Sequence, residues 1–299
     1  MISTSKTGPN PPTAMRKEPR TGLPPTPPDP NLVTLTRHPS FTIVSIHAEP
    51  ANVLTRNLWG ALAAALRVVQ ADDTQLGIAF LSGLRKPIFS AGNDIRELYA
   101  PNTSAARYQD FWLTSNTFLI DLYTSRLVTV AAIKGASPAG GCALSLCCDI
   151  RIMTSNAHMK SYIGLNEVAL GIHVPKYWGE LMRRTASKAC GAAIDRVLLN
   201  ATLMPSEQAF DMGLVDELVD DAAALERRAV EVLEAATGRK SARVMAARHT
   251  TKLLGREAFV AQWSAYLDGE ATLGWAALAD EGTVKTLEGV LSRLKKSKL

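Results

Sequence analysis

The stretch Ala131–Met153 reads AAIKGASPAGGCALSLCCDIRIM and decides the fold. It completes the apolar run Val128–Ile133, crosses a glycine-containing loop, and continues into Ala139–Cys147, whose composition favours a helix. A second strand-like run, Asp149–Thr154, follows at once. Short apolar strands that alternate with helices are typical of βαβ crossovers, in which parallel strands are covered on both faces. We therefore expect an α/β fold with a mainly parallel sheet.

The same alternation extends outward from this stretch. Apolar runs of strand length and segments with helical spacing follow one another toward the N-terminus, and the chain after about residue 175 is mostly helical. The last third therefore predicts a separate helical layer that caps a site or packs against other subunits. The expected strands are Phe41–His47, Leu76–Leu81 and His158–Ile163, and the expected helices are Leu54–Val69 and Ala105–Leu122.

The N-terminal segment differs in composition from the rest of the 299-residue chain. Residues 1–30 contain nine of the sixteen prolines and almost no large apolar side chains. Such a segment buries too little apolar surface to offset the entropy lost on ordering. We expect residues 1–35 to form a disordered proline-rich arm, with a mitochondrial transit peptide as the alternative. Residues 36–220 would form the core, and 221–296 a helical region for capping or oligomerisation.

Charge and cysteine content exclude several functional classes. The formal net charge is +5, but the excess comes from residues 1–40 and 293–299, and the part between them is slightly acidic. A basic nucleic-acid-binding face is therefore not expected. No apolar run approaches the length of a membrane span. The four cysteines lack paired C-x-x-C spacing, and the histidines lack metal-ligand spacing, so we expect reduced thiols and no metal site.

The chain ends in Ser297-Lys298-Leu299, the tripeptide read by the peroxisomal import receptor. An accidental match at the end of a lysine-rich helix is the alternative. Because the signal is read only at a free C-terminus, and the tripeptide stands there, we expect a peroxisomal location with that receptor as a partner. A mitochondrial location is the second possibility.

Two glycine-containing loops follow strand-like segments. They are Phe89–Asp94 (FSAGND) and Gly135–Cys142 (GASPAGGC). Glycines let the backbone approach a ligand closely, and N–H groups at a helix start are unpaired. Two such loops at one sheet edge could hold an anionic oxygen between two amides, although each loop taken alone is more often a tight turn. Neither loop matches a dinucleotide fingerprint or a phosphate loop, which disfavours NAD and ATP.

A third stretch, Ile163–Ile172 (IGLNEVALGI), places Glu167 in an otherwise apolar segment. Burial there would raise the pKa of Glu167 and suit it to proton transfer near neutral pH. A glutamate at a helix start that faces water is the alternative, and the pattern alone does not decide between the two.

These three stretches together resemble one known family. FSAGNDIREL, AAIKGASPAGGCALSLCCDIRIM and IGLNEVALGI are similar, in order and spacing, to the motifs of the crotonase (enoyl-CoA hydratase/isomerase) family. The similarity runs from about residue 40 to 220. It implies a crotonase-like ββα superhelix with mainly parallel sheets, followed by a helical C-terminal region. It also implies an acyl-CoA thioester substrate, no separate cofactor, and trimers or dimers of trimers.

The resemblance also implies roles for individual residues. Glu167 would be the single acid/base of a Δ3,Δ2-enoyl-CoA isomerase, because IGLNEVALGI is similar to the catalytic segment of these enzymes. The backbone N–H groups of Asn93 and Gly140 would bind the thioester oxygen, although the family usually has a small or apolar residue at position 93. The substrate-binding residues implied are Ala91, Gly92, Asp94 and Ile95, with Arg96 either near the CoA phosphates or simply solvated.

At two positions this chain has a residue that differs from the one usual in related enzymes of the family. Hydratases of the family have a second glutamate where this chain has Ala143, so hydration is expected to be poor. His173 stands where the isomerases usually have an apolar residue; it would be a structural histidine or would contact the acyl chain or Glu167. The alternatives to an isomerase are another crotonase reaction, such as hydration or dienoyl isomerisation, or a non-catalytic acyl-CoA-binding protein.

Overall fold

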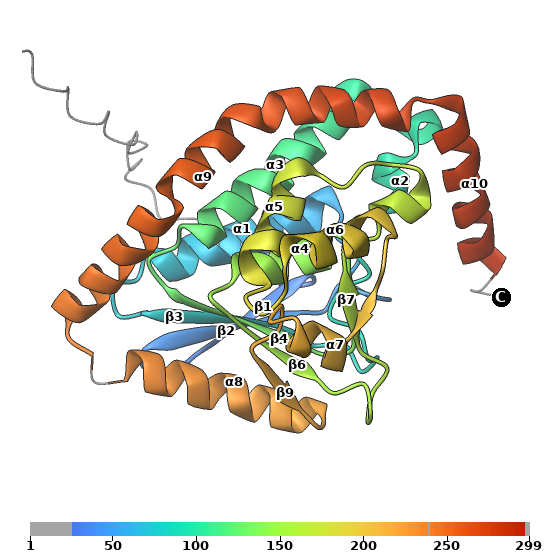
Figure 1. The fold of residues 1–299 in the computed structure, drawn as a ribbon. Helices are drawn as coiled ribbons and strands as arrows, with labels where there is room; N and C mark the ends of the chain where they lie inside the picture. Colours follow the sequence, from blue (N-terminus) through green and yellow to red (C-terminus); the bar gives the residue numbers. More distant parts are fainter. Residues whose placement is uncertain (1–25, 239, 297–299) are drawn as a thin grey trace, which may run out of the picture.

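A six-stranded sheet forms the centre of the computed structural model, which describes residues 26–238 and 240–296 (Figure 1). Its strand order is β1-β2-β3-β4-β6-β9, and every neighbouring pair is parallel except β1 with β2. The strands are β1 (Val33–Arg37), β2 (Phe41–Ile46), β3 (Gly77–Ser82), β4 (Val128–Ile133), β6 (Ile150–Thr154) and β9 (Glu217–Val219).

A small second sheet lies beside the first and carries the loops of interest. It consists of β5 (Ala136–Pro138), β7 (Tyr162–Gly164) and β8 (Met204–Pro205). β5 pairs in parallel with β7, and β7 pairs antiparallel with β8. Because β5 follows β4 directly and β7 follows β6, each long strand continues into a short one and then a helix. This is the repeated ββα unit.

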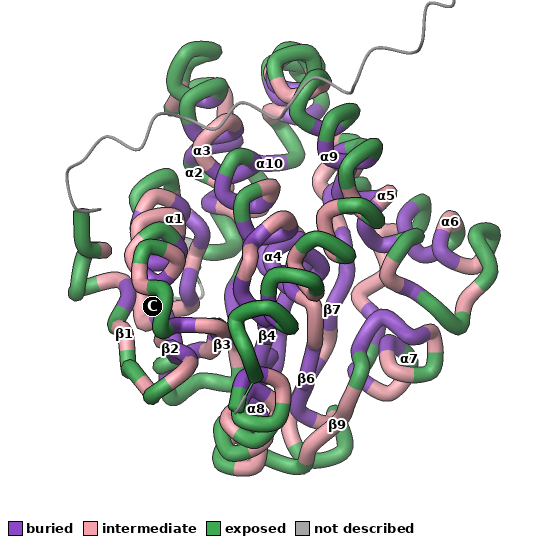
Figure 2. Tube along the Cα trace, turned by 90° about the vertical axis from the view of Figure 1, so that its left-hand side faces the viewer, coloured by how far each residue is buried: buried purple, intermediate pink, exposed green. Residues whose placement is uncertain are grey.

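Helices cover both faces of the large sheet. α1 (Arg56–Gln70), α3 (Ala105–Tyr123), α4 (Gly140–Cys147) and α5 (Lys176–Thr185) lie over one face, and α8 (Ala222–Thr237) lies across the other (Figure 1). The inner strands β2, β3, β4 and β6 are largely buried on both sides, as Figure 2 shows for β4 and β6, whereas the edge strands β1 and β9 are partly exposed. In β4, Val128 and Val130 belong to the cluster under α8. Ala131 and Ile133 belong to the larger cluster on the helical side, as the two-residue period of a strand requires.

The remaining helices extend the helical side of the molecule. The longest, α9, curves along α3, and α10 descends beside α2 and the turn η2 (Figure 1). Among the described residues, none of the helices combines the length and the apolar character that a membrane span needs. The bounds are α2 (Ile95–Leu98), η1 (Ala100–Asn102), η2 (Glu167–Leu170), α6 (Gly191–Leu199), α7 (Ser206–Asp211), α9 (Ala242–Leu278) and α10 (Glu281–Lys296).

The expected α/β fold is confirmed, with differences at the ends of the chain. The predicted arm boundary at residue 35 falls inside β1, whose residues 33–37 pair with β2 and whose Val33 is fully buried. Residues 1–25, the bulk of the predicted arm, and the tripeptide 297–299 lie outside the described residues. The region 221–296 is not one separate layer, because α8 covers the sheet while α9 packs along α3. Three of the four free cysteines are buried, and only Cys190 is exposed.

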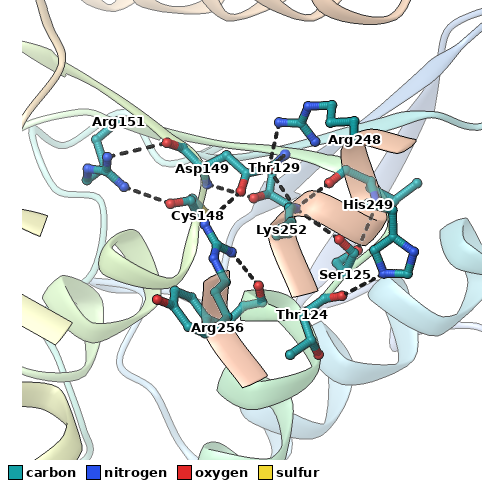
Figure 3. A network of polar contacts seen from close by, with 12 residues as sticks. Thr124, Ser125, Thr129, Cys148, Asp149, Arg151, Arg248, His249, Lys252 and Arg256 are labelled. Atoms are coloured by element: carbon teal, nitrogen blue, oxygen red, sulfur yellow. Dashed lines mark hydrogen bonds and ion pairs between the residues drawn. The ribbon is translucent and has the colours of Figure 1, made fainter. Parts of the chain in front are cut away.

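A buried ion cluster fixes the first half of α9 to the sheet. Asp149, between α4 and β6, lies 2.7 Å from the Lys252 Nζ atom and 3.1 Å from guanidinium nitrogens of Arg248 and Arg256 (Figure 3). The three cations are spaced four residues apart, so they lie on one face of the helix. Lys252 also donates to the carbonyl oxygens of Ser125 and Leu127 at the start of β4.

The charges in this cluster decide the ionisation of Asp149. Burial acts to raise the pKa of Asp149, but the combined attraction of Lys252, Arg256 and Arg248 outweighs it and leaves the pKa below its usual value. The side chain is only 9% exposed, so solvent screens these attractions weakly. Asp149 therefore stabilises the fold in its ionised form.

We expect Asp149→Asn to lower the free energy of unfolding by about 3 kcal/mol at pH 7, because the buried Lys252 and the half-buried Arg248 and Arg256 would lose their shared counterion. Since the folded pKa is depressed, this contribution is present above the unfolded pKa of about 3.9 and is lost as the pH falls below it. Urea unfolding at pH 7 and pH 3.5 measures the difference. Asp110→Asn is the control, because Asp110 pairs with Arg56 at the exposed surface; an equal effect of the two changes would contradict the prediction.

Candidate active site

An apolar cavity of about 250 Å³ lies between the helical side of the sheet and the C-terminal helices. Its walls come from the loop before α2, from α3, from the segment 166–178, and from α9 and α10. Most of its lining is aliphatic or aromatic, and the polar side chains are few. The lining residues are Ala91, Asn93, Ile95, Leu98, Tyr108, Trp112, Pro138, Ala139, Asn166, Glu167, Leu170, Ile172, His173, Pro175, Trp178, Glu270, Gly274, Ala277, Leu278 and Val290.

The first predicted loop, residues 89–94, is held by the turn that precedes α1. Asn52 has a left-handed backbone (φ 47°), and its side-chain amide donates to the Phe89 carbonyl oxygen at 2.9 Å. Ser90 donates its hydroxyl to the Asn52 carbonyl and accepts from the Gly92 N–H. These bonds hold the conformation of the loop, which begins seven residues after the end of β3.

The second predicted loop is built around close backbone approaches. A Cβ atom at Gly135 (φ 69°) would lie 1.9 Å from the Pro87 carbonyl oxygen, so only glycine fits there. Ala139, at the start of α4, also has a positive φ of 49°, an uncommon and strained conformation for alanine. Its N–H donates to the Gly164 carbonyl oxygen at 2.8 Å. This bond joins the start of α4 to the segment that leads into Glu167.

The two loops meet at the cavity. A Cβ atom at Gly140 would lie 2.5 Å from the Asn93 side-chain oxygen, and one at Gly92 would lie 3.0 Å from the Pro138 carbonyl oxygen. The Asn93 side chain is engaged by the Trp59 indole N–H at 3.2 Å. The backbone N–H groups of Asn93 and Gly140 are not among the donors of the bonds that hold these loops. Both amides thus lack a described backbone acceptor; Asn93 lines the cavity, and Gly140 follows the lining residue Ala139. An oxyanion hole needs two such free donors.

Glu167 is buried in the same cavity. It begins the turn η2, separated from the end of β7 by two residues, and is only 5% exposed. Neither of its carboxyl oxygens has a hydrogen-bond partner from another residue in the described part of the chain. Burial raises the pKa of Glu167 to about 7. The alternative of a water-facing glutamate is therefore wrong, and the side chain is suited to take up and release a proton near neutral pH.

The other predicted substrate-binding residues divide between two places. Ala91 and Ile95 line the apolar cavity, whereas Gly92 lies behind it, against the second loop. Asp94 caps α2 and forms a two-pronged ion pair with Arg96, at distances of 2.8–3.0 Å. Both belong to a neighbouring polar cleft lined also by Arg56 and Arg107. Asp94 and Arg96 are thus near the cavity but not within it.

Two polar residues flank Glu167 in the cavity lining. Asn166 precedes it in the chain and was not singled out by the sequence. His173 lies exposed at the cavity and makes no hydrogen bond to another described residue, so it is not a satisfied buried histidine. Among the residues that the structure describes, no group of three or more His, Cys, Asp or Glu side chains is arranged to hold a metal ion.

Sequence reasoning missed a second buried carboxyl group in the cavity. Glu270 of α9 is 2% exposed, and burial raises its pKa to about 7. It lies 103 positions after Glu167 in the chain, within a long helix whose local sequence gives no sign of a cavity. The aromatic residues of α3, Tyr108 and Trp112, were likewise not predicted to line the site. No motif could have found them, because only tertiary packing brings these helices to Glu167.

Comparison with known protein families shows to which family this chain belongs. The model of the family described as enoyl-CoA hydratase/isomerase matches residues 40–281, which is most of the chain. The chain belongs to the enoyl-CoA hydratase/isomerase family. The match covers both loops, Glu167 and the whole of α9. The predicted crotonase fold is thereby confirmed at the level of the family.

Individual members of the enoyl-CoA hydratase/isomerase family extend this comparison. The rat mitochondrial enoyl-CoA delta isomerase 1 is 36% identical over 181 residues, which is 60% of each protein. The human mitochondrial enoyl-CoA delta isomerase 1 is 31% identical over 253 residues, 83% of this chain and 78% of that protein. The crystal structure of human mitochondrial delta3-delta2-enoyl-CoA isomerase superposes with a TM-score of 0.81 and 28% identity, covering 89% of this chain and 99% of that one.

The raised pKa of Glu167 predicts a pH-dependent effect on stability. The folded state, with a pKa of about 7, binds more protons than the unfolded state between the two pKa values, so ionisation of Glu167 destabilises the fold as the pH rises. Glu167→Gln removes this penalty. We expect the variant to exceed the wild type by about 3 kcal/mol in free energy of unfolding at pH 8, and by almost nothing at pH 4.

Chemical denaturation of both proteins at the two pH values measures this difference. Glu257→Gln provides the matched control, because Glu257 is exposed on α9. A Glu167→Gln variant that is no more stable than the wild type at pH 8 would show that the carboxyl group is solvated.

Proposed function

We propose that this protein is a Δ3,Δ2-enoyl-CoA isomerase, which moves the double bond of a 3-enoyl-CoA ester to the trans-2 position. The observation that carries the proposal is the unpartnered, buried carboxyl group of Glu167 beside two available backbone amides. Family membership supports it, as does the similarity to proteins named enoyl-CoA delta isomerase.

The reaction needs one proton carrier and one site for negative charge. Ionised Glu167 takes a proton from C2 of the substrate, and the electron pair moves toward the thioester oxygen to give an enolate. The Asn93 and Gly140 N–H groups donate to that oxygen, each contributing on the order of 3 kcal/mol. The enolate electrons then shift the double bond to C2–C3, and the same carboxyl group returns the proton at C4.

The raised pKa suits this cycle because Glu167 must be both base and acid. A carboxyl group with an ordinary pKa holds its proton too weakly to take one from carbon efficiently at neutral pH. With a pKa of about 7, a large share of the protein carries the ionised base near neutrality, and that base is stronger than an ordinary carboxylate. The apolar cavity walls keep water from competing for the proton.

The coenzyme A head would lie outside the cavity, over the loop 91–96. The cleft that contains Asp94 and Arg96 has a volume of about 560 Å³ and opens to solvent. Arg56, Arg96 and Arg107 supply cations that suit phosphate groups, although each also has a carboxylate partner. The acyl thioester would then enter the cavity past Ala91 and Asn93.

We expect Glu167→Gln to lower turnover of 3-hexenoyl-CoA and 3-dodecenoyl-CoA at least about 10³-fold, because the amide cannot accept the C2 proton. Binding of a saturated acyl-CoA should be retained. A coupled assay of 2-enoyl-CoA formation measures turnover, and calorimetry measures binding. Glu257→Gln is again the control; unchanged turnover in Glu167→Gln would remove the basis of the proposal.

Hydration of crotonyl-CoA tests the main alternative reaction. Ala143 is fully buried in α4 and presents only a methyl group where hydratases of the family have a second glutamate. A water molecule would lack the second carboxylate that orients it, so we expect hydration to be at least about 100-fold slower than isomerisation. A hydration rate that equals the isomerisation rate would favour the hydratase assignment.

Location and assembly stay predictions. The peroxisomal address Ser297-Lys298-Leu299 lies outside the described residues, and the rat and human relatives are mitochondrial by name. Fluorescence microscopy of the tagged chain with and without this tripeptide separates the two locations. Light scattering tests the trimer or hexamer that the family resemblance implies.

A further inference from the structure

Two polar residues that line the cavity, Trp112 and Glu270, are not used by the proposed reaction. They belong to the part of the cavity wall that is formed by α3, the start of α5 and the second half of α9. Glu270 extends from α9, and its Oε1 atom accepts a hydrogen bond from the Lys176 backbone N–H at 2.5 Å. One of the two carboxyl oxygens of Glu270 therefore caps the first turn of α5.

The other carboxyl oxygen of Glu270 has no such role. Its Oε2 atom is buried and has no hydrogen-bond partner in the described part of the chain. The indole N–H of Trp112, on the facing helix α3, is also buried and unpartnered. Both residues line the cavity. A buried acceptor and a buried donor that lack partners each destabilise the folded state.

Ring packing brings these two groups to the same wall. Trp112 stacks on Trp178 with ring centroids 5.5 Å apart, and Trp178 lies two residues after Lys176, the residue capped by Glu270. Tyr108, one turn before Trp112, reaches α9 at Gly274, where a Cβ atom would lie 2.3 Å from the tyrosine hydroxyl. Trp112 and Glu270 thus lie where α3, α5 and α9 come together, and neither belongs to the loops that carry Asn93 and Ala139.

The chemistry of this wall selects one kind of ligand group. An alkyl chain would leave both Glu270 Oε2 and the Trp112 N–H unsatisfied. A carboxylate would meet the acidic Glu270, and no lysine or arginine is among the described residues that line the cavity. A hydroxyl group donates one hydrogen bond and accepts another, so it can satisfy both atoms at once.

On the basis of the proposed function, we propose that Trp112 and Glu270 form a polar subsite for a hydroxyl group on the acyl chain, so that the enzyme prefers hydroxylated acyl-CoA esters. The hydroxyl hydrogen is donated to Glu270 Oε2, and the hydroxyl oxygen accepts from Trp112 Nε1. Tyr108 and Trp178 pack against the flanking methylene groups. Glu270 is a specificity-determining residue in this scheme, and proton transfer stays with Glu167.

Binding of saturated esters tests the subsite without turnover. Calorimetry would compare ω-hydroxyacyl-CoA with the plain acyl-CoA for hexanoyl, octanoyl, decanoyl and dodecanoyl chains. We expect tighter binding of the hydroxy ester for at least one chain length. Trp112→Phe removes the donor and keeps an aromatic ring, and Glu270→Gln keeps the cap on Lys176 while it replaces the free acceptor with a donor. Each should weaken binding of the hydroxy ester about tenfold and of the plain ester less than about twofold.

Trp275→Phe is the matched control, because Trp275 packs on Tyr108 but does not line the cavity. Equal binding of hydroxy and plain esters at every chain length would overturn the proposal. Equal losses for both esters in the variants would overturn it too, since they would mark a structural role. Isomerisation of plain 3-dodecenoyl-CoA by the wild type separates the two proposals. Turnover by the wild type together with equal binding of hydroxy and plain esters refutes only the subsite, whereas tighter binding of a hydroxy ester without any turnover refutes only the isomerase.

Discussion

An ionisable carboxyl group held in an apolar cavity is the constraint on which the rest of this structure depends. Glu167 loses its hydration and gains no partner from another described residue, which destabilises the folded protein whenever the group is charged. Two short connections hold it there: only two residues separate β7 from η2, and the Ala139 N–H donates a hydrogen bond to the Gly164 carbonyl oxygen. The same bond fixes the start of α4, so the base and the amide at Gly140 are positioned together.

The two buried glutamates of the cavity show that burial alone does not define a role. Both have pKa values raised to about 7 by loss of solvent. Glu270, however, gives one oxygen to the start of α5, whereas Glu167 gives neither oxygen to another described residue. A group that must exchange protons with a substrate benefits from having no competing partner, and a group that orients a ligand benefits from being held.

The sequence predicted the features that lie in short contiguous segments. It did not predict the part of the cavity wall that tertiary packing brings together from distant helices. The strands at Phe41, Leu76 and Val128, the two loops and Glu167 were found because each is a short contiguous pattern. The strands β5 and β8 are three and two residues long, too short for any period to be read. The wall of Trp112 and Glu270 was missed because its members are separated by more than 150 positions and come from helices whose apolar faces indicate only a core.

The long helix α9 serves two purposes in this fold. Near one end its cations enclose Asp149, and about 27 Å further along the axis it supplies Glu270 to the cavity. The same helix thus attaches the C-terminal region to the sheet and forms part of the cavity wall. Relatives that accept longer or shorter acyl chains would therefore need a shift of the whole of α9, or different side chains on the face of α9 that lines the cavity. A longer loop would not be enough.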